Sequence, residues 1–390
     1  MNHFEFAIIG GGVAGLCAAV FGGNKICVIE RNNETGKKLL LSGSGQCNIT
    51  HGGKMSDFLN NYGDNKKSHF VKPALFAFDN IAVTNFFIKQ GIQIYHREDG
   101  KIFPQSMRSY DVREVLTKSI KEKIITNTTV INVTKNTQGF VIETESSAFT
   151  ASKLLLATGG CSYPSTGSNG DGYKFAKSLG HTIIQPKPAL APIIIKNFRF
   201  ANSAGISFRQ VKIEIYRNEK RIHHGIGDVL LTHRGLSGPG ILNLSRYVEP
   251  NDEIRIPIID PKLESEIFRG KKILKNVLSD SGVPSRFVMQ LLCQLEVPFD
   301  LPAAEISREI RKQLVSLSFI VEQIGNWNEA MSTAGGVAID EVNRRTMESR
   351  IVPNLFFAGE ILDIDGNCGG YNIHFALATG KLAAISATSK

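Results

Sequence analysis

The chain has few cysteines, and their arrangement indicates neither a metal site nor a disulfide framework. The six stand at positions 17, 27, 47, 161, 293 and 368, and no two form a CxxC pair. No apolar run approaches the ~20 residues that a membrane-spanning helix needs. The N-terminal residues lack the charged leader and cleavage site of a signal peptide. These absences predict a reduced, cytoplasmic protein without a metal or a membrane partner.

Internal repeats and low-complexity segments are also missing, and 42% hydrophobic with 21% charged residues is typical of a globular protein. At 390 residues the chain is long for a single core, which predicts two or three lobes.

The charge is basic and uneven. The net charge is +9, which favours an anionic partner such as nucleic acid, a phosphorylated metabolite or a membrane surface. A generally basic proteome is the alternative explanation. Residues 195–221 carry seven Lys or Arg against two Glu, and residues 31–72 carry seven against three acidic residues. Such runs are usually solvated faces, so charge alone leaves a polyanion site open.

The N-terminal segment has the pattern of a dinucleotide site. An apolar strand over Phe6–Ile9 runs into three consecutive glycines and a helix of small residues that includes Gly15, and a second strand over Lys25–Ile29 ends on Glu30. Gly10 permits the tight turn, Gly12 lets the backbone approach a pyrophosphate, and Gly15 allows close helix packing. Glu30 lies 20 residues after Gly10, where a carboxylate accepts the adenosine ribose hydroxyls and repels a 2′-phosphate. The pattern predicts FAD or NAD and not NADP.

The remaining segments suggest a discontinuous first domain. Glycine-rich residues 36–64 have no helical or strand period, and Pro73–Gln90 has a helical pattern. Three prolines within Pro186–Pro192 mark a boundary, after which short strands predict a small sheet or barrel. Residues 261–331 are helical in pattern, and strand character returns from Gly335. We therefore predict a nucleotide domain over 1–190 and 332–390, a barrel-like subdomain over 191–260 and a helical subdomain over 261–331.

Several motifs follow one another in the order of a known family. They span Gly36–Thr50, Ala157–Gly160, Thr166–Tyr173, Leu231–Pro239, Gly335–Val337, Thr346–Ser349, Gly359–Gly366 and Gly369–Asn372. With the N-terminal pattern, they resemble the HI0933-like flavoproteins, also called the BaiN or aminoacetone-oxidase type. The resemblance implies an α/β fold, in which a glutathione-reductase-like FAD-binding Rossmann domain carries an inserted β-barrel and a helical subdomain.

The resemblance also implies a set of FAD-binding residues. They are Gly10, Gly12, Val13, Ala14, Gly15, Glu30, Arg31, Lys38, Ser42, Gly43, Cys47, Asn48, Val130, Ala157, Thr158, Gly159, Gly160, Gly359, Glu360, Gly369, Gly370, Tyr371 and Asn372. Arg31 and Lys38 are implied near the adenosine and pyrophosphate, and Val130 as a backbone contact to adenine. Gly359 and Glu360 are implied at the ribityl chain. A helix that starts near Asn372 is implied to aim its N-terminus at the flavin ring.

Three residues are catalytic candidates from the same resemblance. Cys47 lies beside the flavin in the family, where a thiol can donate a proton; the alternative is a buried cysteine without chemistry. His233 is either a substrate contact or a turn residue. Tyr371 either stacks or donates near the flavin ring, or it has a packing role alone. The chain departs from the family pattern at Gln46, which replaces an arginine, and at His51, which replaces an asparagine.

The expected activity is hydride transfer between flavin N5 and a substrate carbon. No second GxGxxG occurs, so NADH or NADPH would be a transient electron donor. The basic charge favours reduction of uridine to dihydrouridine in ribosomal RNA, an activity linked to the family. The alternatives are a small-molecule flavin oxidase or enone reductase acting on amino ketones or conjugated ketones, and a non-catalytic FAD-binding interaction protein.

Overall fold

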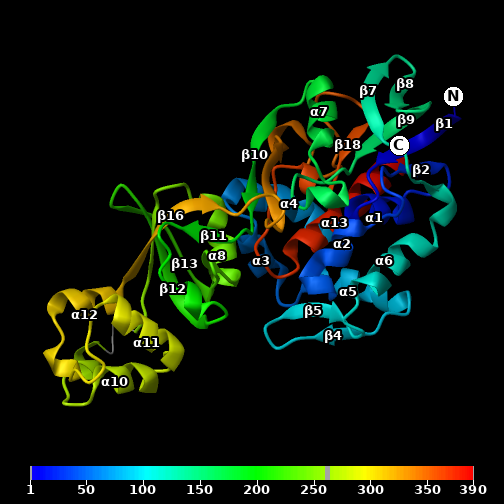
Figure 1. Ribbon diagram of the computed structural model, residues 1–390. Coiled ribbons are helices and arrows are strands. Elements are labelled where there is room, and N and C mark those ends of the chain that lie inside the picture. The colour runs from blue at the N-terminus through cyan, green and yellow to red at the C-terminus, as the bar shows by residue number, and fades with distance from the viewer. Residues whose placement is uncertain (1, 260–263, 390) are drawn as a thin grey trace. The chain divides into compact units, whose positions relative to one another are not determined.

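The computed structural model describes residues 2–259 and 264–389. The chain divides into two compact units, Met1–Lys187 with Met331–Lys390, and Pro188–Ala330. Both termini belong to the first unit (Figure 1). The sequence-based boundaries after residues 190 and 331 lie close to these breaks.

A seven-stranded sheet forms the centre of the first unit. Its strands run in the order β6 (Ile124–Ile125), β2 (Ile26–Ile29), β1 (Asn2–Ile9), β9 (Ala148–Leu156), β8 (Gly139–Thr144) and β7 (Val130–Asn136), and β18 (Leu355–Phe357) also pairs with β9. The neighbours of β1 are parallel to it, and β18 is parallel to the second half of β9. All four residues of β2 are buried, which is typical of a parallel strand covered on both faces. The carboxyl ends of β1, β2, β9 and β18 therefore meet at one edge.

Two helices pack on each other beside this sheet. α1 (Val13–Phe21) is the first helix after β1, and α13 (Tyr371–Thr388) is the last helix of the described chain. Gly380 of α13 makes close packing possible, because a Cβ there would lie 2.2 Å from the carbonyl oxygen of Ala14. The C-terminal segment is therefore held against the first glycine-rich turn.

The first unit also contains further helices and two smaller sheets. Its remaining helices are α2 (Lys37–Leu41), α3 (Met55–Phe58), α4 (Asn65–Ala77), α5 (Asn80–Lys89), α6 (Ser109–Lys118) and α7 (Asp171–Ser178). A three-stranded sheet contains β3 (Thr50–His51), β5 (Lys101–Pro104) and β4 (Ile94–His96), and β10 (Ile183–Ala189) pairs with β17 (Ser332–Val337).

One predicted helix proves to be two. The pattern over Pro73–Gln90 is interrupted at Phe78, and Asp79 starts α5 by accepting a hydrogen bond from the backbone N–H of Ala82 at 2.8 Å. Residues 36–64 hold short elements, which are too brief to show a period.

The second unit contains a closed barrel. Its strands follow the order β11 (Ile193–Ile195), β14 (Gly235–Ser237), β13 (Lys220–Leu231), β12 (Ser207–Arg217), β15 (Glu253–Ile256) and β16 (Leu317–Ile324). Its helices are α8 (Pro239–Leu244), α9 (Glu264–Ile267), α10 (Leu274–Asp280), α11 (Ser285–Gln294) and α12 (Arg308–Val315).

The barrel and these helices share a hydrophobic core. The rings of Phe208 in β12 and Phe287 in α11 lie 5.0 Å apart. The barrel also closes through β16, which lies in the range that the sequence pattern assigned to the helical subdomain. The two predicted inserts are thus one compact unit.

None of the described helices combines the length and the hydropathy required to cross a membrane.

Candidate functional site

Three glycines after β1 build a turn with one open side. Gly10 has φ +105°, and a Cβ there would lie 2.5 Å from the carbonyl oxygen of Ala157. A Cβ on Gly15 would lie 1.9 Å from the carbonyl oxygen of Gly10. Within the described part of the chain, no atom lies within 4 Å of the Cβ position of Gly12. The backbone excludes side chains at Gly10 and Gly15, whereas Gly12 faces open space, as a close approach of a pyrophosphate requires.

The N-terminus of α1 opens at this turn. The helix begins at Val13, and Gly12 provides no side-chain cap. The N–H of Leu16 is the first to bond within the helix, to the carbonyl of Gly12, so the preceding N–H groups are available to an anion. Ala14 is buried against Gly359, whose φ is +74° and whose Cβ would lie 2.9 Å from the Cβ of Ala14.

Glu30 is buried and held by donors. Its Oε2 accepts from the N–H of Gly11 at 2.7 Å, and its Oε1 accepts from the backbone N–H and side-chain amide of Asn32 at 2.9 and 2.7 Å. Asn127 and Thr128 bond to the backbone of Asn32 and Glu30. This brings the start of β7 at Val130 close to the end of β2. A fixed carboxylate beside the glycine turn fits an adenosine ribose, because ionised oxygens accept further hydrogen bonds.

Arg31 is tied to the first residue of α7 and to the segment before that helix. Its guanidinium forms an ion pair with Asp171 at 2.8 Å and contacts the carbonyl of Gly167 at 3.4 Å. The pair is about three-quarters buried, with 27% and 25% of the side chains exposed. Arg31 therefore closes the loop over the end of β2, beside the expected adenosine position.

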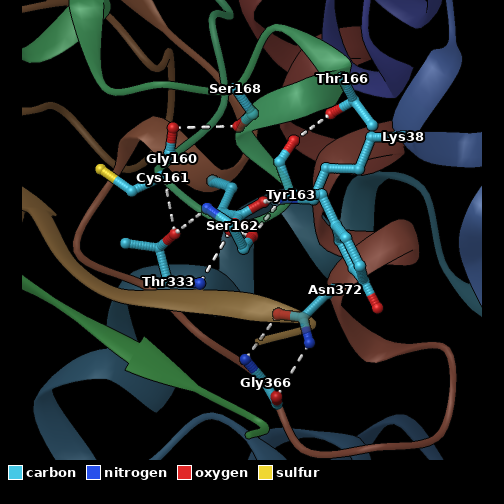
Figure 2. A network of polar contacts seen from close by, with 11 residues as sticks. Lys38, Gly160, Cys161, Ser162, Tyr163, Thr166, Ser168, Thr333, Gly366 and Asn372 are labelled. Carbon is cyan, nitrogen blue, oxygen red and sulfur yellow. Dashed lines mark hydrogen bonds and ion pairs between the residues drawn. The ribbon is translucent and has the colours of Figure 1, made fainter. Parts of the chain in front are cut away.

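The segment after β9 is organised by Thr333 (Figure 2). The Thr333 hydroxyl accepts from the N–H groups of Cys161 and Ser162 at 2.9 and 3.2 Å. A Cβ on Gly160 would lie 2.3 Å from this hydroxyl. Gly159 has φ +74°, and Ser168 donates to the carbonyl of Gly160 at 2.9 Å. The Ala157–Gly160 segment is thus fixed at the same sheet edge as the glycine turn, with the Thr158 side chain directed toward Gly172.

Lys38 and Glu360 form an ion pair at 2.5 Å, with 26% and 19% of their side chains exposed. Ser162 contacts both, since it bonds to Lys38 and donates to Glu360 at 2.8 Å. The backbone N–H of Thr333 also donates to Glu360 at 2.8 Å. This network joins α2, the segment after β9 and the segment after β18.

The loop after α2 is left-handed over several residues. Gly43, Ser44 and Cys47 have φ values of 55°, 56° and 59°. Ser42 donates to the carbonyl of Leu39 at 2.6 Å, and Asn48 accepts from the N–H of Ile102. The Cys47 side chain is fully buried, and burial raises the pKa of its thiol to about 12. The thiol is therefore protonated but enclosed, which favours the packing role over proton donation.

The Gly369–Asn372 segment starts α13. A Cβ on Gly370 would lie 2.8 Å from the backbone of Thr50, and Gly369 packs against the Tyr371 ring. Asn372 bonds both ways with the backbone of Gly366, at 2.7 and 2.9 Å (Figure 2). The Asn372 amide therefore fixes the loop before the helix. The helix starts at Tyr371, one residue before the predicted position.

Tyr371 is buried in an aromatic cluster. Its ring is stacked on His51 and meets Phe58 edge-on at 4.7 Å. Tyr62 donates to the carbonyl of Tyr371 at 2.9 Å. Burial raises the pKa of the Tyr371 phenol to about 12. The Tyr371 ring thus packs against its aromatic neighbours, and its role at the flavin ring stays a prediction.

His233 belongs to the second unit and is exposed there. It lies in the turn between β13 and β14, where the N–H of Thr232 donates to the carbonyl of Gly235 at 2.8 Å. Its neighbour Arg234 forms an ion pair with Glu329. His233 thus occupies a turn, and its role as a substrate contact stays a prediction.

The sequence analysis missed residues that support the site through hydrogen bonds. Ser162 and Thr333 organise the segment after β9, and Lys67 of α4 forms ion pairs with Asp363 and Asp365 at 2.8 and 3.4 Å. A lone serine or threonine carries no spacing signal, so only the fold brings them together. Among the described residues, no group of three or more His, Cys, Asp or Glu is placed to hold a metal ion.

These features define a Rossmann-type dinucleotide-binding protein. A strand runs into a glycine turn that is open at Gly12, a helix N-terminus follows, and a buried acidic residue stands after the next strand. The model of the HI0933-like protein Rossmann domain matches residues 4–386. The chain therefore belongs to the HI0933-like family, whose members are FAD-dependent oxidoreductases. The resemblance drawn from the motifs is confirmed, and so is the fold class, a Rossmann-type FAD-binding domain with an inserted barrel.

Two curated relatives align over nearly the whole chain. The 3-dehydro-bile acid delta(4,6)-reductase of Clostridium scindens is 30% identical, with 99% of each chain covered. The ribosomal RNA dihydrouridine synthase of Escherichia coli is 29% identical, with 98% of each chain covered. Among solved structures, a variant of E. coli quinol fumarate reductase FrdA matches 100% of this chain and 71% of its own, with a TM-score of 0.52 and 14% identity. At that identity the likeness shows the fold alone.

Proposed function

We propose that this protein is a cytoplasmic FAD-dependent reductase of an activated C=C bond, and that its substrate is uridine in ribosomal RNA. The observation that carries the proposal is the open backbone at Gly12 beside the buried Glu30, in a chain that aligns end to end with a dihydrouridine synthase. Dihydrouridine differs from uridine by two hydrogens across one C=C bond, so the product requires a hydride donor and a proton.

The residues divide between binding and support. Gly12 and the N-terminus of α1 would hold the pyrophosphate, and Glu30 the adenosine ribose. Lys38 and Glu360 would lie along the middle of the cofactor, where their charges balance each other. FAD, when bound, supplies a hydride at N5 to an electron-poor carbon. NADH or NADPH is the proposed electron donor.

The α13 segment would set the electrostatics near the flavin ring. The helix has 18 residues and starts without a side-chain cap, so its first N–H groups carry a partial positive charge. Tyr371 is protonated at neutral pH and held by aromatic packing. We do not assign the proton donor of the substrate carbon to Cys47, because the Cys47 side chain has no exposed surface.

Net charge favours RNA over a small substrate. A protein with a net charge of +9 attracts polyanions. In the described structure, Arg199, Arg209 and Lys220 are exposed on the second unit. If the substrate were a neutral or weakly acidic small molecule, it would not account for the positive net charge of the protein.

The second candidate is a reductase of small conjugated ketones. The relative named as a delta(4,6)-reductase favours this candidate. It is 30% identical to this chain and the RNA-modifying relative is 29% identical, so sequence identity does not separate the two substrates. Both candidates need a hydride and a proton on adjacent carbons.

Nucleoside mass spectrometry separates the two. The purified protein with NADH or NADPH is incubated anaerobically with ribosomal RNA from a strain that lacks dihydrouridine, and in parallel with a conjugated enone. Dihydrouridine that forms with the original protein, but not with a variant unable to bind FAD, supports the RNA substrate. Enone reduction without dihydrouridine supports the second candidate, and flavin that NAD(P)H cannot reduce supports a non-catalytic FAD protein.

A further inference from the structure

The loop between β18 and α13 is joined to the start of α4 by ion pairs. The ammonium of Lys67 lies 2.8 Å from the Asp363 carboxylate and 3.4 Å from the Asp365 carboxylate, which are 296 and 298 positions away in the sequence. The three side chains are largely buried, with 19%, 17% and 1% exposed. Asp363 also accepts a hydrogen bond from the backbone N–H of Gly335 at 3.1 Å. One cation is thus shared by two carboxylates of the same loop.

Neighbouring contacts join the same two segments. The backbone N–H and the side-chain amide of Asn367 donate to the carbonyl and the side chain of Asn61, at 2.9 and 3.2 Å. The Tyr62 phenol donates to the carbonyl of Tyr371 at 2.9 Å, and a Cβ on Gly366 would lie 3.1 Å from the Tyr62 ring. Residues 61–67 therefore contact residues 363–371 at several points, and we call this set of contacts the loop clamp.

The helix itself does not favour a lysine at position 67. α4 begins at Asn65, so Lys67 is its third residue and lies in the first turn. The N-terminus of a helix carries a partial positive charge, and a cation there is locally unfavourable. The backbone N–H of Lys67 donates to the N-cap Asp64 at 2.9 Å, whereas its ammonium bonds to another segment. The lysine is therefore explained by the loop clamp and not by the helix.

The loop clamp lies on the side of the sheet to which the cofactor would extend. In the proposed arrangement, the adenosine lies at Glu30 after β2 and the pyrophosphate at Gly12 after β1. The sheet continues from β1 to β9, and β18 pairs with β9. Ligands of open α/β sheets lie along the carboxyl edge. The flavin half would therefore extend past the segment after β18, which leads into the clamped loop.

We propose that Lys67 is a positioning residue, which holds the clamped loop in place for the flavin half of FAD. Without the ammonium, the two carboxylates lose their shared cation, and a buried charge without its partner is costly. The loop then opens toward water. Because Asn372 bonds to Gly366 inside this loop (Figure 2), the opening also loosens the start of α13. The inference rests on the proposed function in taking FAD as the cofactor, and not on the substrate.

Three variants test the loop clamp against a matched control. Lys67→Met removes the ammonium and keeps an unbranched side chain, and Lys67→Arg keeps a cation. Asp363→Asn weakens the same contact from the other side, because a neutral acceptor forms a weaker bond. The control is Lys66→Met, since Lys66 is the preceding residue of the helix and its pair with Asp340 is exposed. The FAD-loaded proteins are compared by hydrogen exchange of backbone amides, by FAD titration and by the reduction potential of the flavin.

We expect Lys67→Met to raise hydrogen exchange selectively in residues 363–372 and to weaken FAD binding by about tenfold or more. Lys67→Arg should restore both properties, and Lys66→Met should match the original protein. Asp363→Asn should also raise exchange and weaken FAD binding, although it changes the charge in the opposite direction. The reduction potential follows that charge, since negative charge near the flavin disfavours its electron-rich reduced form. It should fall in Lys67→Met and rise in Asp363→Asn.

Several results would overturn the proposal. Exchange and FAD affinity of Lys67→Met that match those of Lys66→Met would remove the positioning role. Opposite changes in FAD affinity for Lys67→Met and Asp363→Asn would assign the effect to charge alone, and an unchanged potential in both would place the loop clamp away from the flavin. If Lys67→Met does not fold, Asp363→Asn decides by the same comparison with the control.

The measurements contain neither RNA nor a ketone, so a wrong substrate assignment leaves all of these results unchanged. An original protein that binds no FAD would overturn the proposed function, and with it the role assigned to Lys67.

Discussion

The ammonium of Lys38 and the carboxylate of Glu360 lie 2.5 Å apart, although 322 positions separate them in the sequence. The pair joins α2, which follows the second strand, to the segment after β18. Ser162 contacts both partners. Three separate segments meet at this pair. The ion pair therefore forms only when the discontinuous first unit is assembled.

This pair should be coupled energetically. A double-mutant cycle with Lys38→Met and Glu360→Gln is expected to give a coupling of about 1 kcal/mol in urea unfolding, since both side chains are largely buried. The matched control is Lys66 with Asp340, where 60% and 72% of the side chains are exposed; its coupling should be near zero. Equal values for the two pairs would contradict the assigned role of the Lys38–Glu360 contact.

Gly12 and Gly15 should respond to alanine in opposite ways. Gly12→Ala meets no described atom within 4 Å, so folding should be unchanged, while FAD binding should weaken by about tenfold or more, or about 1.4 kcal/mol. Gly15→Ala places a methyl group 1.9 Å from the carbonyl oxygen of Gly10, so the fold itself should be destabilised. Thermal melts of the FAD-free proteins and FAD titrations measure both effects. Normal FAD affinity in a folded Gly12→Ala would show that the pyrophosphate does not approach there.

Cys47 should be chemically silent in the folded protein. Because the thiol is enclosed and its pKa is about 12, iodoacetamide should label the exposed Cys293 far faster than Cys47. Cys47→Ala should keep turnover within about tenfold, whereas loss of a general acid costs typically 10²–10⁴-fold. Peptide mass spectrometry follows the labelling. A loss of turnover in that range, with FAD still bound, would restore Cys47 as the proton donor.

His374 should make stability depend on pH. Its Nε2 faces the carbonyl of Phe78 at 2.7 Å and its Nδ1 faces the hydroxyl of Thr50 at 2.6 Å, which is the pattern of a neutral ring. Burial lowers its pKa from 6.5 to about 4. The unfolded chain therefore binds the proton more readily, and stability is full above pH 6.5 and lost as the pH falls toward 4, by an amount on the order of 3 kcal/mol.

Urea unfolding at several pH values tests this. His374→Leu should be less stable at pH 7.5 but should lose less stability on acidification. His181, whose pKa burial also lowers, keeps part of the pH dependence in the variant. Parallel curves for the variant and the original protein would assign the effect to other groups.

The sequence predicted the glycine turn and the acidic residue because their spacing is set by backbone geometry close in the chain. Gly10, Gly12, Gly15 and Glu30 all lie around one turn and its flanking strands. Contacts between distant segments carry no such spacing. The bonds of Thr333 to the segment after β9, and of Arg31 to Asp171, depend on how the sheet edge is assembled.

The closure of the barrel could not be predicted from the sequence for the same reason. The strand over Leu317–Ile324 closes it next to Ile193–Ile195, across more than a hundred residues that include helices. Local composition could therefore suggest strands and helices, but not that they share one core. A motif likewise gives the sequence neighbours of Cys47, whereas only the fold gives the burial of its side chain.

The most direct test of the proposed activity is a single turnover without oxygen. The bound FAD is first reduced with one equivalent of NADH or NADPH, and dihydrouridine-free ribosomal RNA is then mixed in while flavin absorbance is followed. We predict reoxidation of the flavin together with about one dihydrouridine per flavin by nucleoside mass spectrometry. A flavin that stays reduced with RNA and is reoxidised by a conjugated ketone would contradict the RNA assignment.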